Sequence, residues 1–269
     1  MGLILNAGIS LYLIKAATIA FISIGFLIFL INYSPFLKKI FPDYTLQLGG
    51  LIGNTSFLGI PIANALIEAK FLPDDVINLS VGFDLGTTLF AWIFGPFFLQ
   101  EKVRQIKLLN IKKFSNALIS SPASKGIIGV LIVYLLGLEE DFGNWLSLPT
   151  TVVINLAILV VGTRLGIITN NKNDKNNIKE LNKPFKYSIL LKLLIFPSII
   201  FFVCKTLDFN LDQATATVIQ SGTPSAISTI LMAEAYKYNQ GTAAQIVFRT
   251  TLISFITIPI LTLLICKFY

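Results

Sequence analysis

The sequence contains no histidine, only two cysteines and few charged residues for its length. Of its 269 residues, 13% are charged and 54% are hydrophobic, whereas a soluble domain carries about 25% charged residues. The lack of histidine removes the commonest catalytic base and metal ligand, and Cys204 and Cys266 have neither metal-binding nor redox spacing. The sequence therefore argues against an enzyme, and no cofactor or metal is expected.

Long apolar runs, separated by short polar connections, make up most of the chain. A transmembrane α-helix needs about 20 mainly apolar residues, and eight segments approach this length. They are residues 10–31, 46–67, 76–98, 117–138, 146–168, 185–207, 212–236 and 243–266. The sequence predicts an all-α membrane protein with about eight transmembrane helices, whose surroundings are the lipid bilayer.

The net charge of +7 is spread over alternate connections between these spans. Fourteen Lys and Arg residues lie in the connections after spans one, three, five and seven, and only Lys70, Lys205 and Lys267 lie on the opposite side. Cytoplasmic connections carry such an excess of positive charge. We predict a multi-pass protein of the cell membrane (inner or plasma membrane), with both termini outside the cytoplasm and no nucleic-acid partner.

The connection at residues 99–116 holds five of these basic residues, interleaved with apolar ones. This pattern is typical of a basic helix that lies on the membrane surface. A plain cytoplasmic loop accounts for it equally well.

An internal repeat relates the two ends of the chain. Shifting the sequence by 163 residues without a gap superposes spans two and three on spans seven and eight. The matches include Gly59 on Gly222, Pro61 on Pro224 and Thr87-Thr88-Leu89 on Thr250-Thr251-Leu252. Because the offset of five spans is odd, the copies cross the membrane in opposite directions, as in many secondary transporters. The chain divides into an N-terminal repeat of three helices (1–98), the basic connection (99–116) and a C-terminal repeat of five helices (117–269), so two N-terminal spans are expected to be missing.

Spans two and seven contain helix-breaking residues at corresponding positions. Proline removes a helical hydrogen bond and glycine lowers the cost of unwinding. At membrane depth, the freed backbone groups need protein or a watery cavity, and the next helix start suits a small anion such as a carboxylate. The predicted substrate pathway consists of Asn54, Thr55, Ser56, Gly59 and Pro61 in span two and of Gly222, Thr223, Pro224 and Ser225 in span seven. Ordinary proline kinks are the alternative for either span alone.

Charged residues inside the spans are further candidates, because charge is costly at depth and marks ion or substrate pathways. Asp84 lies well inside span three and is the candidate site for a coupling cation or proton. Arg249 lies one or two turns into span eight and is a candidate ligand for an anionic substrate. Alternatively, the two pair with each other, or Arg249 reaches the interface. Lys15 and Lys192 are expected to lie near span ends or to reach the interface, and no role is predicted for them.

Over nearly the whole chain, and most specifically in the two interrupted spans, the sequence resembles the auxin efflux carrier family of permeases, which includes plant PIN-type carriers and bacterial organic-acid permeases. The resemblance is carried by Asn54-Thr55-Ser56-Phe57-Leu58-Gly59-Ile60-Pro61, Gly222-Thr223-Pro224-Ser225-Ala226, Ala233-Glu234-Ala235-Tyr236, Thr250-Thr251-Leu252 and Pro259. It implies a ten-helix fold of two inverted five-helix repeats with crossed broken helices, and a homodimer. It also implies that this chain lacks the first two family helices, and that the substrate is an organic anion.

The resulting hypothesis is a secondary transporter that moves a small organic anion by alternating access, with its site where the two broken helices cross. An ion or solute channel and a truncated membrane protein that does not transport remain as alternatives.

Overall fold

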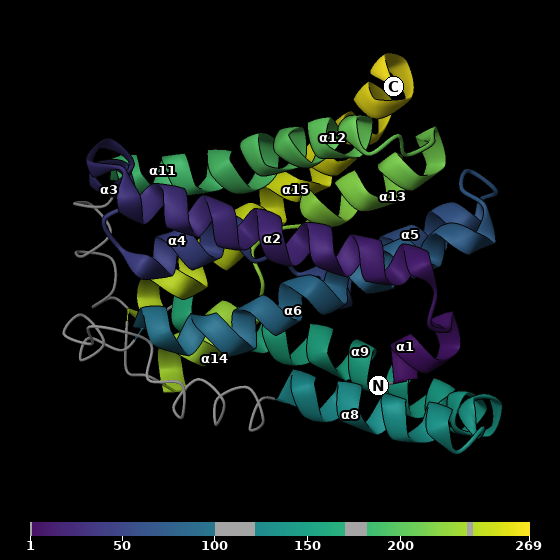
Figure 1. Ribbon diagram of the computed structural model, residues 1–269. Coiled ribbons are helices and arrows are strands. Elements are labelled where there is room, and N and C mark those ends of the chain that lie inside the picture. The colour runs from purple at the N-terminus through teal and green to yellow at the C-terminus, as the bar shows by residue number, and fades with distance from the viewer. Residues whose placement is uncertain (1, 100–121, 170–181, 236–238) are drawn as a thin grey trace.

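The computed structural model describes residues 2–99, 122–169, 182–235 and 239–269. Within these ranges the regular elements are helices, with no strand (Figure 1). They are α1 (Gly2–Ala7), α2 (Leu11–Tyr33), α3 (Pro35–Ile40), α4 (Tyr44–Leu51), η1 (Thr55–Gly59), α5 (Ile60–Glu68), η2 (Asp74–Val76), α6 (Ile77–Leu99), α8 (Pro122–Leu135), α9 (Glu139–Thr169), α11 (Asn182–Leu190), η4 (Leu191–Ile195), α12 (Phe196–Thr206), α13 (Leu211–Ser221), α14 (Ser228–Ala235) and α15 (Gln240–Phe268). All but the first residue of the basic connection at 99–116 lies outside the described residues.

Four helical stretches of the described chain are long and apolar enough to cross a membrane. They are Leu11–Tyr33, Asp74–Gly95, Lys183–Thr206 and Gln240–Phe268. Large apolar side chains such as Phe26, Leu148 and Phe255 are exposed on the outer faces of the bundle, where lipid rather than water is the favourable surrounding. The predicted all-α membrane fold is confirmed.

Two of the predicted spans are interrupted, each by a short non-helical segment. In the first, α4 ends at Leu51 and η1 begins at Thr55; in the second, α13 ends at Ser221 and α14 begins at Ser228. The first break is followed by the π-helical turn η1, which continues directly into α5, and Pro61 lies where the two join. Pro224 lies within the second break itself. We call residues 52–54 the first break and residues 222–227 the second break.

The two breaks pair with each other as a short antiparallel bridge between Gly53 and Ser225. The Asn54 N–H donates to the Pro224 carbonyl at 2.7 Å, and the Ala226 N–H donates to the Ile52 carbonyl at 2.9 Å. Each break thus supplies partners for backbone groups that the other leaves open, as burial at membrane depth requires. In Figure 1, α4 and α14 lie toward the left and α5 and α13 toward the right, so the two interrupted helices cross at their breaks.

Helix α6 is held close against α2 by two glycines one turn apart. A Cβ on Gly82 would lie 2.2 Å from the Leu13 carbonyl oxygen, and one on Gly86 would lie 2.1 Å from the Ala17 carbonyl oxygen. Small residues four apart allow such close backbone approach between membrane helices. This packing fixes the position of α6, and with it Asp84, beside the first break.

Helix α2 begins, and α15 ends, at the right-hand side of Figure 1. Which face meets the cytoplasm remains a prediction from the Lys and Arg distribution.

Candidate functional site

The polar side chains after the first break converge on one carboxylate. The hydroxyls of Thr55 and Ser56 each donate to Asp84 Oδ1 at 2.5 Å. Asp84, from α6, is only 9% exposed. A buried carboxylate needs such donors because desolvation of an unpaired charge is expensive. The structure thus brings three of the predicted residues together at the start of the second half of this helix, and it places Asn54 beside them in the bridge.

The second break is held by hydroxyl groups of its own residues and of α15, and by a backbone carbonyl of α4. The Ser225 N–H donates to Thr250 Oγ1 at 3.0 Å, and the Ser225 hydroxyl donates to the Gly49 carbonyl of α4. The Thr223 hydroxyl donates to the Gln220 carbonyl at 2.7 Å. All of these side chains are buried. The predicted residues of span seven therefore lie at the crossing, where their hydroxyls satisfy local backbone groups.

Two glycines of span two let the breaks approach each other. A Cβ on Gly59 would lie 2.1 Å from Gln220 Oε1. A Cβ on Gly53 would lie 2.5 Å from Thr223 Oγ1 and 2.9 Å from Lys192 Nζ. Glycine is required at both positions because any other residue has a Cβ that would collide with these atoms. These contacts also show which polar side chains surround the crossing: Thr223, Gln220 and Lys192.

Lys192 is buried at the crossing, so the expectation that it reaches the interface is wrong. It lies in η4, a π-helical turn, and its side chain is 0% exposed. Its Nζ donates to the Ser221 carbonyl, the last residue of α13, at 2.8 Å, and lies 5.0 Å from the centre of the Phe196 ring. Among the described residues it forms no ion pair. The sequence signal that could have identified Lys192 is its position inside the Lys183–Thr206 span, because charged residues there usually face the interior of the bundle or a cavity.

Gln220 is a second residue that sequence reasoning missed. Its side chain is 0% exposed, and neither Oε1 nor Nε2 has a hydrogen-bond partner among the described residues. An unpaired buried amide carries a desolvation cost that a ligand or water would remove. Because Gln220 faces Gly59 across the crossing, this amide is available to a bound molecule there.

Arg249 lies away from the crossing. Its side chain is exposed, with the guanidinium carbon 4.9 Å from the centre of the Phe185 ring and Nη2 3.4 Å from Gln245 Oε1. Within the described residues it does not pair with Asp84, whose oxygen accepts from Thr55 and Ser56. The structure therefore joins all the predicted pathway residues except Arg249 and Pro61 into one cluster at the breaks.

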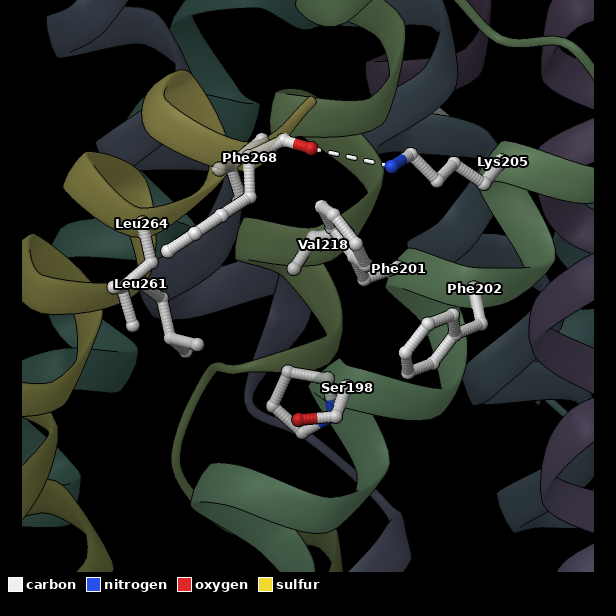
Figure 2. A pocket seen from close by; sticks show the side chains of 10 residues that line it. Ser198, Phe201, Phe202, Lys205, Val218, Leu261, Leu264 and Phe268 are labelled. Carbon is white, nitrogen blue, oxygen red and sulfur yellow. Dashed lines mark hydrogen bonds between the residues drawn. The ribbon is translucent and has the colours of Figure 1, made fainter.

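A cavity of about 410 Å³ lies between α12, α13 and α15, away from the breaks (Figure 2). Its walls include Phe201, Phe202 and Leu264, and Lys205 at its rim donates to the Phe268 carbonyl at 3.2 Å. None of the predicted site residues lines it. Its apolar lining suits a lipid chain and offers nothing to a small charged substrate.

The polar groups at the crossing are suited to binding a polar molecule. The site offers hydroxyls, one amide, one carboxylate and one ammonium, and among the described residues no three His, Cys, Asp or Glu side chains gather as metal ligands. Side chains of this kind select and orient a polar molecule.

Comparison with known proteins identifies the family. A family model described as membrane transport protein matches residues 112–262, which is more than half of the chain. The match includes the second break, Lys192 and Gln220. Compared with the curated proteins, the chain has no match. The family consists of transporters rather than enzymes, and the chain belongs to it: this is a member of the membrane transport protein family, the family of the auxin efflux carriers.

Proposed function

We propose that the protein is a secondary carrier that moves a small organic anion by alternating access, with its substrate site at the crossing of the two breaks. The family supports transport across a membrane. The location of the site is supported by the bridge between Gly53 and Ser225, since interrupted helices that meet near the midplane form the binding sites of many inverted-repeat transporters.

The buried ammonium of Lys192 is the observation that favours an anion. Removing an ammonium from water costs several kcal/mol. Interaction of the ammonium with the C-terminal end of a helix stabilises it by up to about 2 kcal/mol, and interaction with a desolvated aromatic face stabilises it by a similar amount. The ammonium has three N–H donors, and among the described residues one of them has a partner, Ser221. A carboxylate bound beside Gly53 would supply the missing counter-charge.

The neighbouring polar groups suit the same ligand. The unpaired Gln220 amide offers N–H donors to carboxylate oxygens. Asp84, in contrast, is already held by Thr55 and Ser56. An anion therefore finds its donors on the Lys192 side of the crossing and a like charge on the Asp84 side, which orients it.

Uptake into proteoliposomes tests this function. The wild-type chain is reconstituted and offered radiolabelled monocarboxylates and dicarboxylates, with indole acetate and malate as the first probes. We expect saturable uptake of one class that is accelerated by unlabelled substrate inside, as a carrier requires. Asn54→Ala and Pro224→Ala should reduce uptake to the level of empty liposomes. The first removes a polar side chain at the crossing, and the second removes the ring that prevents the second break from continuing as a helix.

The matched control is Ser198→Ala, which removes an exposed hydroxyl that donates to the Leu194 carbonyl of the preceding turn, η4. It should transport like wild type, and all variants should insert in equal amounts. Wild-type rates in both Asn54→Ala and Pro224→Ala would place the substrate path elsewhere. Currents far above carrier turnover would identify a channel instead.

A further inference from the structure

The Lys192 ammonium lies at the crossing, at the point where the half-helix α13 ends. The Lys192 ammonium donates to the Ser221 carbonyl, and Ser221 is the last residue of α13. Carbonyl groups at the end of a helix have no partner within it and carry the negative end of its dipole. In transporters with broken helices, such half-helix ends and unwound carbonyls coordinate the coupling cation.

Lys192 belongs to η4, and its fully buried side chain extends from there to the end of α13. Its Nζ also lies next to Gly53, where an added Cβ would be only 2.9 Å away, so the ammonium lies between the end of α13 and the first break. Lys192 forms no ion pair in the part of the chain that the structure describes. Among the described residues, the ammonium therefore contacts a backbone carbonyl and an aromatic ring, and no carboxylate.

We propose that the Lys192 ammonium occupies the cation position of the crossing, so that this carrier binds its anion there without a coupling metal ion. The inference rests on the proposed function. A tethered ammonium supplies the positive charge that a sodium ion supplies in a sodium-coupled carrier, and its Nζ already binds the Ser221 carbonyl at the end of the half-helix. Asp84, the other charged side chain at the crossing, is held on the far side of the first break by Thr55 and Ser56 and does not offer its oxygen to this position.

Thermal unfolding of the purified full chain in detergent tests the inference without any substrate. The reporter is Cys204, which is buried, in a Cys266→Ser background that removes the exposed thiol. Thiol labelling is followed against temperature in sodium chloride and in choline chloride of equal ionic strength. We expect the midpoint of the wild-type chain to be the same in both salts, because no sodium site is open.

Lys192→Ala should open the cation position. Its midpoint should be lower than that of wild type in choline chloride and should rise by at least about 2 °C in sodium chloride. Lys205→Ala is the matched control, since Lys205 also donates to a backbone carbonyl, that of Phe268, but at the exposed end of α12. It should show no difference between the two salts.

Two results would overturn the inference: a sodium-dependent rise in the wild-type midpoint, or a Lys192→Ala midpoint that does not respond to sodium. If Lys192→Ala does not fold, Lys192→Ser, which keeps a hydroxyl donor for the Ser221 carbonyl, is measured in its place. If neither variant folds, the wild-type comparison decides. Because no substrate is present, a failure of the uptake experiment leaves this result unchanged, and the two proposals fail separately.

Discussion

The two breaks differ in the sign of the charged side chain that binds the adjacent half-helix. Beside the first break, the Asp84 carboxylate accepts from Thr55 and Ser56 where a half-helix begins. Beside the second break, the Lys192 ammonium donates to Ser221 where a half-helix ends. Each charge has the sign that its helix end favours, since anions are stabilised at helix starts and cations at helix ends.

This difference is not present in the repeat itself. Under the shift of 163 residues, Thr87 falls on Thr250, but Asp84 falls on Val247. Thr250 accepts from Ser225 at the second break, whereas the Thr87 hydroxyl has no partner among the described residues. The two repeats therefore share the breaks and their backbone pairing, and each repeat has acquired its own polar partner.

The largest effect is expected at the first break, from Asp84→Ala. Both hydroxyl donors lose their carboxylate acceptor, and each hydrogen bond to a charged group contributes about 1.5–3 kcal/mol. The free energy of unfolding in detergent should therefore fall by about 3–6 kcal/mol, measured by labelling of Cys204 in the Cys266→Ser background. Asp84→Asn keeps an acceptor oxygen and should lose about half as much. An Asp84→Ala chain as stable as wild type would show that this carboxylate does not hold the first break.

How far the sequence predicts such partners depends on the kind of signal. Gly59, Pro61, Gly222 and Pro224 marked both interrupted spans because their effect on a helix is local. The partners of the breaks were harder to predict, since they depend on which face of a neighbouring helix is turned inward. A membrane helix is apolar on all sides, so its hydrophobic pattern does not reveal that face.

Two basic residues illustrate this limit. Arg249 and Lys192 both lie inside apolar spans, and the sequence favoured Arg249 as a ligand. In the structure, Lys192 is turned toward the crossing and Arg249 is exposed over Phe185. Gln220 was missed for a similar reason: its amide matters because Gly59 of the other interrupted helix lies against it. Contacts between segments this far apart in the chain leave no local pattern.

A smaller effect is expected at the second break, from Thr250→Val. This change keeps the shape of the side chain but leaves the buried Ser225 N–H without its acceptor, which costs about 1–3 kcal/mol. Thr251→Val is the control, because the Thr251 hydroxyl bonds only to the Val247 carbonyl of its own helix. The same thiol-labelling measurement should show a clear loss for Thr250→Val and little change for the control. Equal losses would mean that the second break does not depend on α15.

The smallest effect is expected at the caps of the first halves, where the two interrupted helices again differ. Asp43 caps α4 by accepting from the Thr45 N–H at 2.7 Å, and Asn210 caps α13 by accepting from the Gln213 N–H at 2.8 Å. Asp43→Asn makes the first cap like the second. Because Asn and Asp cap about equally well, the free energy of unfolding should change by less than about 1 kcal/mol.

The size of this small change should depend on pH. Burial raises the pKa of the Asp43 carboxyl above its usual 3.8, against the opposing hydrogen bonds from Thr45 and Asn239. A raised pKa in the folded state means that folding favours the protonated form, so wild-type stability falls as pH rises through that pKa. The Asn variant does not titrate, so it should be slightly more stable than wild type at neutral pH, and the difference should vanish below the usual pKa. Unfolding midpoints across this range check the prediction, and a variant less stable than wild type at neutral pH would show that the charge of Asp43 favours the cap despite its burial.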